Sequence, residues 1–275
     1  MGVFQNNLLA GAGGQAGGGA AFYDYQIEQS MRFDRVSDTG LTRTQTTGTS
    51  RRTYTHSVWI KIANNDYNGV ALMIFAAAVS STTNKIDNWN FNTGGGSGVA
   101  IQAIGYNGGT NGVLNTDGIY RDYTGWGHYV LAVDTTQSTA SNRVKLYLNG
   151  SQITSFSTET YPAQNYDGGL GNNSFELAVG MNADNANFGH ELDGYMAEYH
   201  YTDGTAYAST QFGETKNGVW IPKDPTGTSY GNNGHYLKFE NASDLGNDSS
   251  GNNNDFTANN MGTDHQVLDS PTFGS

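Results

Sequence analysis

Three carboxylates in the last third of the chain are spaced in a way that could support catalysis. Glu191 and Asp193 are separated by one residue, and Glu198 follows seven positions after Glu191. Hydrolysis of a glycosidic bond needs two carboxylates across the scissile bond, roughly 5–5.5 Å apart for retention and 6.5–9.5 Å for inversion. Side chains alternate along a strand, so an odd spacing directs Glu198 away from Glu191 unless a β-bulge, for example at Gly194, intervenes. We therefore expect no enzyme and keep a glucanase as a remote alternative.

Of the metals that side chains could bind, the sequence offers candidate ligands only for calcium. The six histidines are scattered and none has the short spacing of a zinc site, so His128 and His200 are expected to be hydrogen-bonded framework residues. Calcium prefers carboxylate, amide and carbonyl oxygens. One loop carries such candidate ligands at Asp244, Asn247, Asp248 and Asp255. The alternative is that these side chains stabilise turns without a metal, so no cofactor is required and calcium stays open.

Several aromatic residues among polar neighbours are candidates for binding a glycan or a protein partner. They are Tyr67, Trp89, Tyr106 and Tyr166. Trp89 lies between two asparagines, and we read its surroundings as a loop. An exposed ring could act as a stacking platform for a sugar, but Tyr and Trp also anchor protein interfaces, so both uses remain open.

Short strands must position all of these residues. Asn149-Gly150 predicts a tight β-hairpin turn, because both central residues of a type I′ turn need positive φ. Before the turn, Val144, Leu146 and Leu148 alternate with polar residues, which is typical of a strand with one buried face. Residues 128–134 are apolar on both parities, as in a strand covered on both sides.

Composition extends this prediction to the whole chain. The 275 residues include 38 glycines and only 14% charged residues, a composition of short strands and many turns. Some ten to twelve strands separated by Gly- and Asn-rich turns predict a β-sandwich or jelly roll. No second core is visible, so we expect a Gly-rich arm at residues 1–22, one domain at 23–260 and a polar, peripheral tail at 261–275.

Charge and hydropathy exclude several classes of partner. The net charge of −12 and the pI of about 4.7 disfavour nucleic acid, because an acidic surface repels phosphates. No stretch reaches the roughly 20 apolar residues of a membrane span. The N-terminal residues lack the pattern of a signal peptide, and the absence of cysteine fixes no compartment.

The Gly-rich arm could be a flexible tail or an anchor. Glycine loses the most backbone entropy on ordering, so such a segment does not order by itself. On a partner surface it could lie flat, with Phe4, Leu8 and Leu9 as apolar anchors.

A set of motifs in the same order resembles the laminin-G-like or concanavalin-A-like jelly roll, an all-β, antiparallel two-sheet sandwich. The motifs are Met31-Arg-Phe-Asp34, Tyr54-Thr-His-Ser-Val-Trp-Ile-Lys61, Trp126-Gly-His-Tyr-Val-Leu-Ala-Val-Asp134, Lys145-Leu-Tyr-Leu-Asn-Gly150 and Leu192-Asp-Gly-Tyr-Met-Ala-Glu-Tyr199. The resemblance covers about residues 30–202. It implies the fold rather than a function, because this fold hosts lectins, adhesion modules and glucanases.

A narrower resemblance connects the chain to structural proteins of marine tailed phages. It is carried by Val3-Phe-Gln-Asn-Asn-Leu-Leu9, Phe22-Tyr-Asp-Tyr25, Val219-Trp-Ile-Pro-Lys223 and Asp269-Ser-Pro-Thr272. It implies a non-enzymatic virion-surface subunit, a head-decoration or head-fibre protein held by its arm to the major capsid protein or another virion protein. Such a subunit is expected to be a homo-oligomer, with a trimer as the candidate, and to bind host or environmental glycans. The alternative is a receptor-binding tail-fibre module that recognises host glycans.

Overall fold

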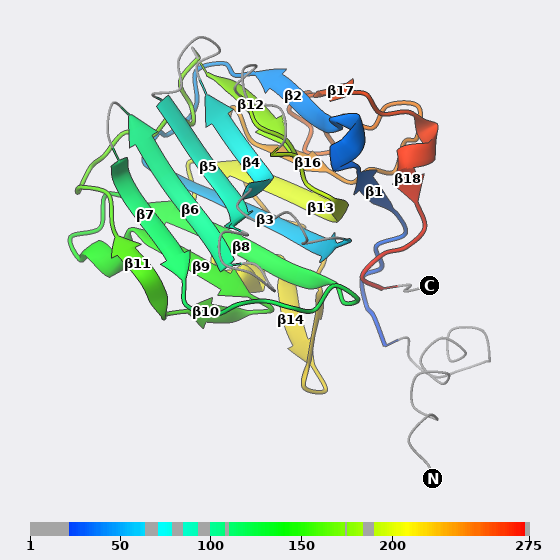
Figure 1. Ribbon diagram of the computed structural model, residues 1–275, viewed down its shortest axis with the longest axis horizontal. Helices are drawn as coiled ribbons and strands as arrows, with labels where there is room; N and C mark the ends of the chain where they lie inside the picture. Colours follow the sequence, from blue (N-terminus) through cyan, green and yellow to red (C-terminus); the bar gives the residue numbers. More distant parts are fainter. Residues whose placement is uncertain are drawn as a thin grey trace.

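Two stacked antiparallel sheets make up the body of the protein in a computed structural model (Figure 1). The structure describes residues 22–63, 71–78, 85–92, 100–107, 110–173, 175–183 and 190–272. These ranges contain no α-helix. The predicted all-β jelly-roll sandwich is confirmed. No helix in the described part of the chain is long and apolar enough to cross a membrane.

The first sheet contains the longest strands. In spatial order it comprises β10 (Ser151–Ile153), β9 (Val144–Leu148), β8 (Gly127–Asp134), β3 (Thr53–Ile62), β13 (Gly194–Asp203), β1 (Ser30–Phe33) and β18 (Gln266–Val267), with β16 (His235–Leu237) also paired to β13. Its inner face contributes Val58, Ile60 and Tyr199 to the core. Its outer face is also covered, because Trp59 and Ala197 pack there with Ile27 in a separate apolar cluster. Strands covered on both faces explain why residues 128–134 are apolar on both parities.

The second sheet closes the core from the other side. It comprises β11 (Phe156–Thr160), β7 (Thr110–Thr116), β6 (Ala100–Asn107), β5 (Lys85–Asn92), β4 (Ala71–Ala78), β12 (Glu176–Val179), β2 (Gly40–Thr44) and β17 (Thr257–Asn259). A separate hairpin is formed by β14 (Gly213–Lys216) and β15 (Val219–Pro222). Short 3₁₀ turns occur at η1 (Arg35–Ser37), η2 (Ala140–Asn142), η3 (Ser209–Gln211) and η4 (Thr263–His265).

The predicted hairpin turn between β9 and β10 is confirmed. Asn149 and Gly150 have φ angles of 47° and 81°, both in the left-handed region. A Cβ at Gly150 would also lie 2.4 Å from the ring of Trp220, so glycine is required here by packing as well as by conformation.

The C-terminal residues belong to the body, which corrects the prediction of a peripheral tail after residue 260. β18 pairs with β1 and extends the first sheet. Ser270 and Thr272 hydroxyls donate to the carbonyl of Ile27, and the Ile27 amide donates to Thr272. The sequence of this tail is polar because these hydrogen bonds, rather than apolar contacts, hold it. The predicted arm at residues 1–22 lies, except for its last residue, outside the described residues.

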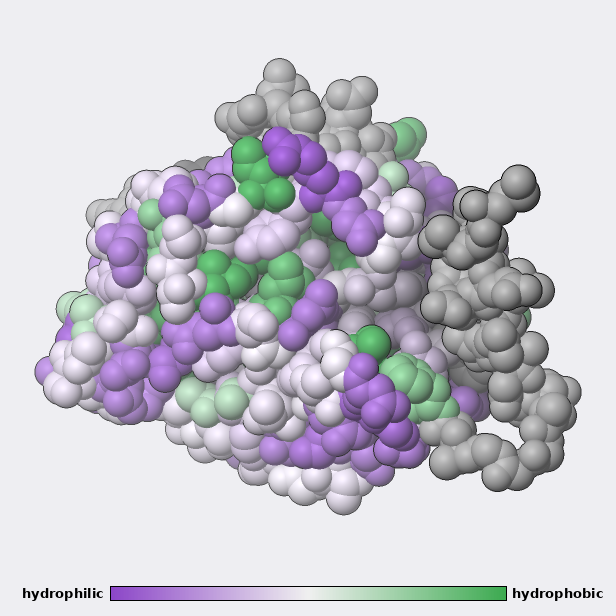
Figure 2. Space-filling model, turned by 90° about the horizontal axis from the view of Figure 1, so that it is seen from below, coloured by the Kyte–Doolittle hydropathy of each residue, from purple (hydrophilic) through white to green (hydrophobic). Residues whose placement is uncertain are grey.

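Few large apolar residues are exposed on the described surface. The large ones are Phe22, Val36, Ile119, Val219 and Leu268, which come from separate parts of the chain. Figure 2 shows apolar residues as small spots among polar ones on the face that it views. Scattered single apolar residues are normal for a protein surface, so recognition has to be sought in hollows.

Candidate functional site

A β-bulge in β13 turns Glu198 onto the outer face of the first sheet. The pairing of β13 with β3 shifts register between Ala197 and His200. As a result Met196 and Tyr199, three positions apart, both face the core. Glu198 has a φ of 51°, a conformation that is uncommon for a residue with a side chain and that often occurs at functional sites.

Two tyrosine hydroxyls engage the Glu198 carboxylate. Tyr25 donates to both carboxylate oxygens at 3.1 Å, and Tyr236 donates to Oε2. The two hydroxyl oxygens lie 2.8 Å apart. Burial and the nearby carboxylate raise the pKa of both tyrosines, so both stay protonated donors. Glu198 is only 6% exposed, so its carboxylate faces these hydroxyls rather than solvent.

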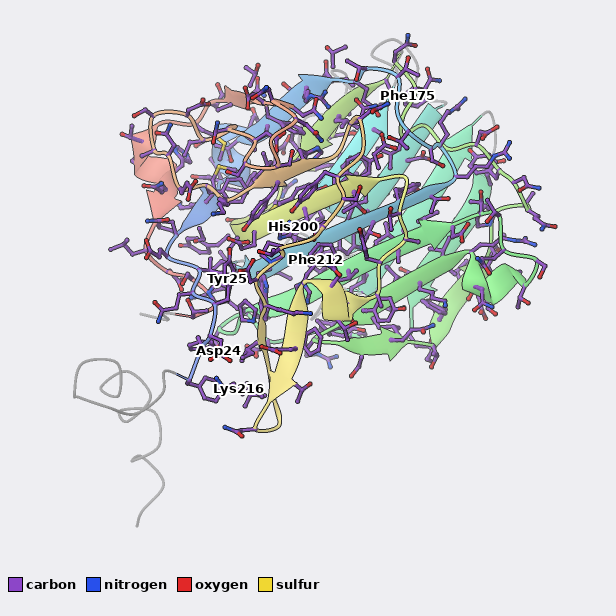
Figure 3. All side chains as sticks on the ribbon, turned by 180° about the vertical axis from the view of Figure 1, so that it is seen from behind. Asp24, Tyr25, Phe175, His200, Phe212 and Lys216 are labelled. Atoms are coloured by element: carbon purple, nitrogen blue, oxygen red, sulfur yellow. The ribbon has the colours of Figure 1, made fainter. Side chains whose placement is uncertain are left out.

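His200 connects this carboxylate to a third tyrosine. Its Nε2 lies 3.6 Å from Glu198 Oε2, and its Nδ1 lies 2.9 Å from the hydroxyl of Tyr230. The His200 ring stacks on Tyr236 at 4.1 Å between centroids. Burial lowers the pKa of His200 although Glu198 opposes the shift, so the imidazole is neutral at pH 7. Figure 3 shows Tyr25, His200 and Phe212 close together behind the sandwich.

Tyr25, Tyr230 and Tyr236 line an open groove of about 390 Å³; Tyr25 and Tyr230 are half-buried, whereas Tyr236 is only 5% exposed. Tyr230 and Tyr236 are stacked almost in parallel, with 6° between their planes and 6.2 Å between centroids. Hydrogen-bonding groups surround the rings: Asp224, Thr226, Thr228, Lys238 and Ser249. The ammonium of Lys238 lies 5.6 Å from the Tyr236 ring centroid. The Tyr25 groove, as we call this hollow, therefore combines aromatic faces with polar groups of both charges.

Among the described residues that line the groove, Asp224 is the one carboxylate. Glu198 lies behind the tyrosines, where their hydroxyls occupy its oxygens. Neither Glu191 nor Asp193 lines the groove, and Glu191 precedes β13 at a buried position. Stacking on the rings and hydrogen bonding to the rim are the interactions that remain for a ligand.

His128 has the framework role that the sequence predicted. Trp220 Nε1 donates to its Nδ1 at 3.0 Å, which leaves the proton on Nε2, where Ser57 Oγ lies at 2.8 Å. The imidazole is stacked between Trp59 and Trp220. Burial lowers the pKa of His128 to about 3, so the ring is neutral and connects Ser57 and Trp220 by hydrogen bonds.

Trp89 requires a correction, because it is not a surface platform. It lies in β5, not in a loop, and has no exposed surface. Asp87, Trp89 and Phe91 alternate with asparagines along this strand, and Trp89 and Phe91 both belong to the core. The asparagines at every second position made this segment look like a loop, although its buried residues alternate with them as in a strand.

The other predicted binding residues are only partly covered by the structure. Tyr67 and the side chain of Tyr106 lie outside the described residues, as do the predicted anchors Phe4, Leu8 and Leu9. Tyr166 is half-buried and lines a different cavity, between the two sheets. The sequence missed Tyr25, Tyr230 and Tyr236 as a group, because only the fold brings them together.

The candidate calcium loop is held by hydrogen bonds of its own. The Asp248 carboxylate accepts from the amides of Tyr236, Ser250 and Asn254 at 2.8–2.9 Å. Asp255 accepts from the amide of Asp248 at 2.8 Å. Among the described residues no cluster of three His, Cys, Asp or Glu side chains is arranged to hold a metal. Calcium binding by Asp244, Asn247, Asp248 and Asp255 stays an untested prediction.

Comparisons with known proteins support the fold. No family model matches the chain, and no curated protein matches it either. A "putative carbohydrate binding protein" from Bacteroides ovatus superimposes with a TM-score of 0.53 at 14% identity, over 86% of this chain and 61% of that one. The chain thus spans less than two thirds of that protein.

Two further solved structures are similar over about two thirds of this chain. A heptameric SAP-like pentraxin from Limulus polyphemus gives a TM-score of 0.47 at 15% identity, over 68% of this chain and 81% of that one. Tailspike protein 2 of an Escherichia coli O157:H7 bacteriophage gives 0.47 at 11% identity, over 66% and 23%. At such identities a likeness concerns the fold alone.

Proposed function

We propose that this chain is a non-enzymatic, glycan-binding jelly-roll subunit displayed on the surface of a phage virion. The observation that carries the glycan-binding part is the Tyr25 groove, where aromatic faces and polar groups converge in one hollow. Sugars present apolar ring faces and many hydroxyls, so such a surface is complementary to them. The putative carbohydrate binding protein from Bacteroides ovatus, which has a similar fold, supports the proposal by analogy.

The tyrosines are preorganised for this task. Tyr25 and Tyr236 are tied to Glu198, and Tyr230 is tied to His200, so the rings are fixed before a ligand arrives. A rigid ring loses little entropy on binding, which raises affinity for a weakly held ligand such as a sugar. The buried carboxylate thus acts through the tyrosines instead of on the ligand.

Replacing Tyr230 with alanine is expected to weaken glycan binding by about 10- to 100-fold, since covering an aromatic ring contributes about 1.5–3 kcal/mol. The glycan is first identified on a glycan array and then titrated by isothermal calorimetry. Tyr230→Phe keeps the ring, loses only the hydroxyl to His200, and should retain most of the affinity. Tyr147→Ala on β9 is the matched control, because Tyr147 is half-buried and lies outside the groove. Absence of binding to every glycan would contradict the proposal.

The virion part of the proposal rests on the resemblance to marine phage proteins and on the arm. Residues 22–27 leave the body at a point fixed by several contacts: Tyr25 binds Glu198, Asp24 pairs with Lys216 at 2.9 Å, and Ile27 bonds Thr272. A firmly held base allows whatever precedes it to act as a tether. We place the protein on the outside of the extracellular particle as a homo-oligomer, with the major capsid protein or another virion protein as the arm's partner.

Deletion of residues 1–21 is expected to abolish incorporation into particles and to leave glycan binding intact. The reason is that both sheets and the Tyr25 groove lie within residues 22–272. Purified particles from a complementation assay are probed by immunoblot, and the truncated protein is titrated with the glycan in parallel. Replacing Phe4, Leu8 and Leu9 together by alanine should reproduce the loss, because each buried apolar side chain contributes about 1.5–3 kcal/mol.

The same particles separate a head subunit from a tail-fibre module. Immunogold labelling over the capsid supports the head-decoration role that we favour. Labelling confined to the tail would replace it by the receptor-binding alternative. Normal incorporation of the truncated protein would refute anchoring by the arm.

A further inference from the structure

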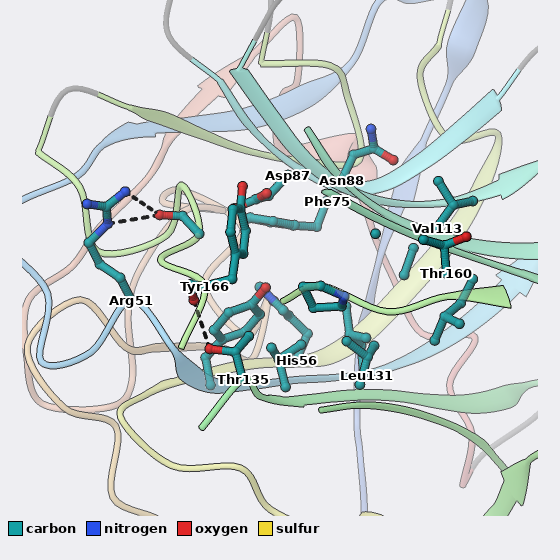
Figure 4. A pocket seen from close by; sticks show the side chains of 18 residues that line it. Arg51, His56, Phe75, Asp87, Asn88, Val113, Leu131, Thr135, Thr160 and Tyr166 are labelled. Atoms are coloured by element: carbon teal, nitrogen blue, oxygen red, sulfur yellow. Dashed lines mark hydrogen bonds between the residues drawn. The ribbon is translucent and has the colours of Figure 1, made fainter. Parts of the chain in front are cut away.

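A small cavity lies between the two sheets, away from the Tyr25 groove. Its volume is about 50 Å³, and its walls come from β4, β5, β6, β7 and β11 of one sheet and from β3, β8 and β9 of the other. Ala103, Leu114, Leu131 and Val133 provide apolar walls, and Figure 4 shows Leu131 beside His56. The cavity and the groove share no lining residue, so the two are independent.

One end of this cavity carries a polar atom with no partner of its own. His56 lines the cavity and has no exposed surface. Its Nδ1 lies 2.8 Å from the hydroxyl of Tyr199, whereas Nε2 has no hydrogen-bond partner among the described residues. Buried polar atoms are almost always paired, so an unpaired nitrogen beside a cavity marks a position for a ligand atom.

Asp87 adds a negative charge to the same lining. Its carboxylate accepts from the amide of Gly169, and only 6% of the residue is exposed. Burial raises the pKa of Asp87 to about 6, so at pH 7 most molecules carry the charge in apolar surroundings. Backbone hydrogen bonds from Gly169 and Leu170 already stabilise this carboxylate, and its two oxygens retain capacity to accept a further hydrogen bond from a ligand.

The mouth of the cavity is rigid. Arg51 donates from Nε and Nη2 to the carbonyl of Gly168 at 2.9 and 2.7 Å, and Thr135 donates to the carbonyl of Tyr166 at 2.8 Å. These bonds fix the loop around residues 166–168, from which Tyr166 and Gly168 line the cavity; Figure 4 shows Tyr166 there. The hollow is therefore formed in advance, as is usual for small-molecule sites.

We propose that this inter-sheet cavity binds a compact ligand with an apolar body and a single hydrogen-bond-donating end. A water molecule needs about 10–15 Å³ by the same measure, so the volume suits a group of roughly three or four non-hydrogen atoms. The apolar body contacts the aliphatic walls, and the donor end faces the Asp87 carboxylate and His56 Nε2, which accepts in the tautomer whose Nδ1 donates to the Tyr199 hydroxyl. An anionic end is excluded by the Asp87 carboxylate.

The test compares three probes of equal length: 1-propanol, propylammonium and propionate. Methyl NMR shifts of Leu114, Leu131 and Val133 are followed at pH 7 as each probe is added. We expect saturable shifts with propanol or propylammonium, and at least about tenfold weaker binding of propionate. If propanol saturates the shifts at a lower concentration than propylammonium, the site prefers a neutral donor. The reverse order shows that it prefers a cationic donor. Shifts that stay linear with all three probes, or equal binding of all three, would overturn the proposal.

Filling the cavity provides the matched control. Ala103→Leu places three more carbons in it and should abolish saturable shifts, whereas Ala140→Leu, at an exposed position, should leave them unchanged. Should Ala103→Leu fail to fold, intermolecular NOEs from the propanol methyl to Leu131 and Val133 of the wild-type protein decide instead. Their absence at saturating probe would equally reject the site.

Discussion

Acidification from pH 7 to pH 5 is expected to lower the free energy of unfolding by about 3 kcal/mol or more. Burial lowers the pKa of His128 and of His235 to about 3 in the folded protein, against about 6.5 in an unfolded chain. Below pH 6.5 the unfolded chain therefore binds protons that the folded protein refuses. Each such histidine destabilises the fold by about 2 kcal/mol at pH 5, or about 4 kcal/mol together.

The other buried titratable groups change the size of the loss in free energy of unfolding but not its direction. His56 and His200 also have lowered pKa values, so they add to the loss. Asp87 acts oppositely: its pKa of about 6 is raised above the unfolded value of 3.8, so the folded protein gains about 1 kcal/mol between pH 7 and pH 5. Stability is thus fully present above pH 6.5 and decreases as the pH falls toward the folded pKa values of the histidines.

Urea denaturation at pH 7, 6 and 5 measures this loss. Calorimetry in two buffers of different ionisation enthalpy counts the protons taken up on unfolding. His128→Gln is the informative variant, because glutamine retains hydrogen-bonding capacity toward Ser57 and Trp220 but does not titrate; it should lower the uptake near pH 5 by about one proton. A free energy of unfolding that stays constant from pH 7 to pH 5 would show that these histidines are not buried as neutral rings.

Local patterns predicted the fold well wherever one residue pair or one alternation decides the structure. The Asn149-Gly150 turn lies where it was predicted, and Val144, Leu146 and Leu148, whose alternation predicted a strand, form β9. β5 and β7 were missed, because Asn-rich strands resemble turn sequences when no core is yet known to take the alternate side chains. The polar C-terminal strand was missed for the same reason.

The candidate site could not be predicted from local patterns at all. Tyr25 and Glu198 are 173 residues apart, and Tyr25 and Tyr236 are 211 apart. Their meeting depends on the bulge in β13, which reverses the parity of every later residue in that strand. The odd spacing between Glu191 and Glu198 predicts opposite faces only for an unbroken strand, whereas Glu191 precedes β13 and a bulge intervenes before Glu198, whose carboxylate holds the tyrosines of the groove.

Asp203→Ala is expected to be among the most destabilising single substitutions, at about 3–5 kcal/mol. Asp203 ends β13 and is only 2% exposed. Its carboxylate accepts from the amides of Thr49, Ser50 and Asn233 at 2.6, 3.0 and 3.0 Å, so one side chain joins two loops to the end of the strand. Alanine leaves three donors without an acceptor, and each buried unpaired amide costs about 1–3 kcal/mol.

The effect should spread through the Asn233 side chain, which binds the same β2–β3 loop that contains Thr49 and Ser50. Its amide nitrogen donates to the carbonyl of Thr46 at 2.6 Å, and its oxygen accepts from the Thr46 amide at 3.0 Å. Asp203→Asn keeps one acceptor oxygen and should lose less stability than Asp203→Ala. The ordering wild type, Asn, Ala is therefore a sharper expectation than either magnitude.

Asp122 is a control that distinguishes the effect of burial from the effect of the number of hydrogen bonds. Its carboxylate also accepts three bonds, from Thr124 N, Thr124 Oγ1 and Gly125 N at 2.9, 2.9 and 3.0 Å, but it lies on an exposed loop. Water replaces those bonds, so Asp122→Ala should change the free energy of unfolding by less than about 1 kcal/mol. Urea denaturation of both alanine variants at pH 7 tests this difference. Equal losses would mean that the Asp203 corner is open to water, and that the first sheet is not held at this end by a buried carboxylate.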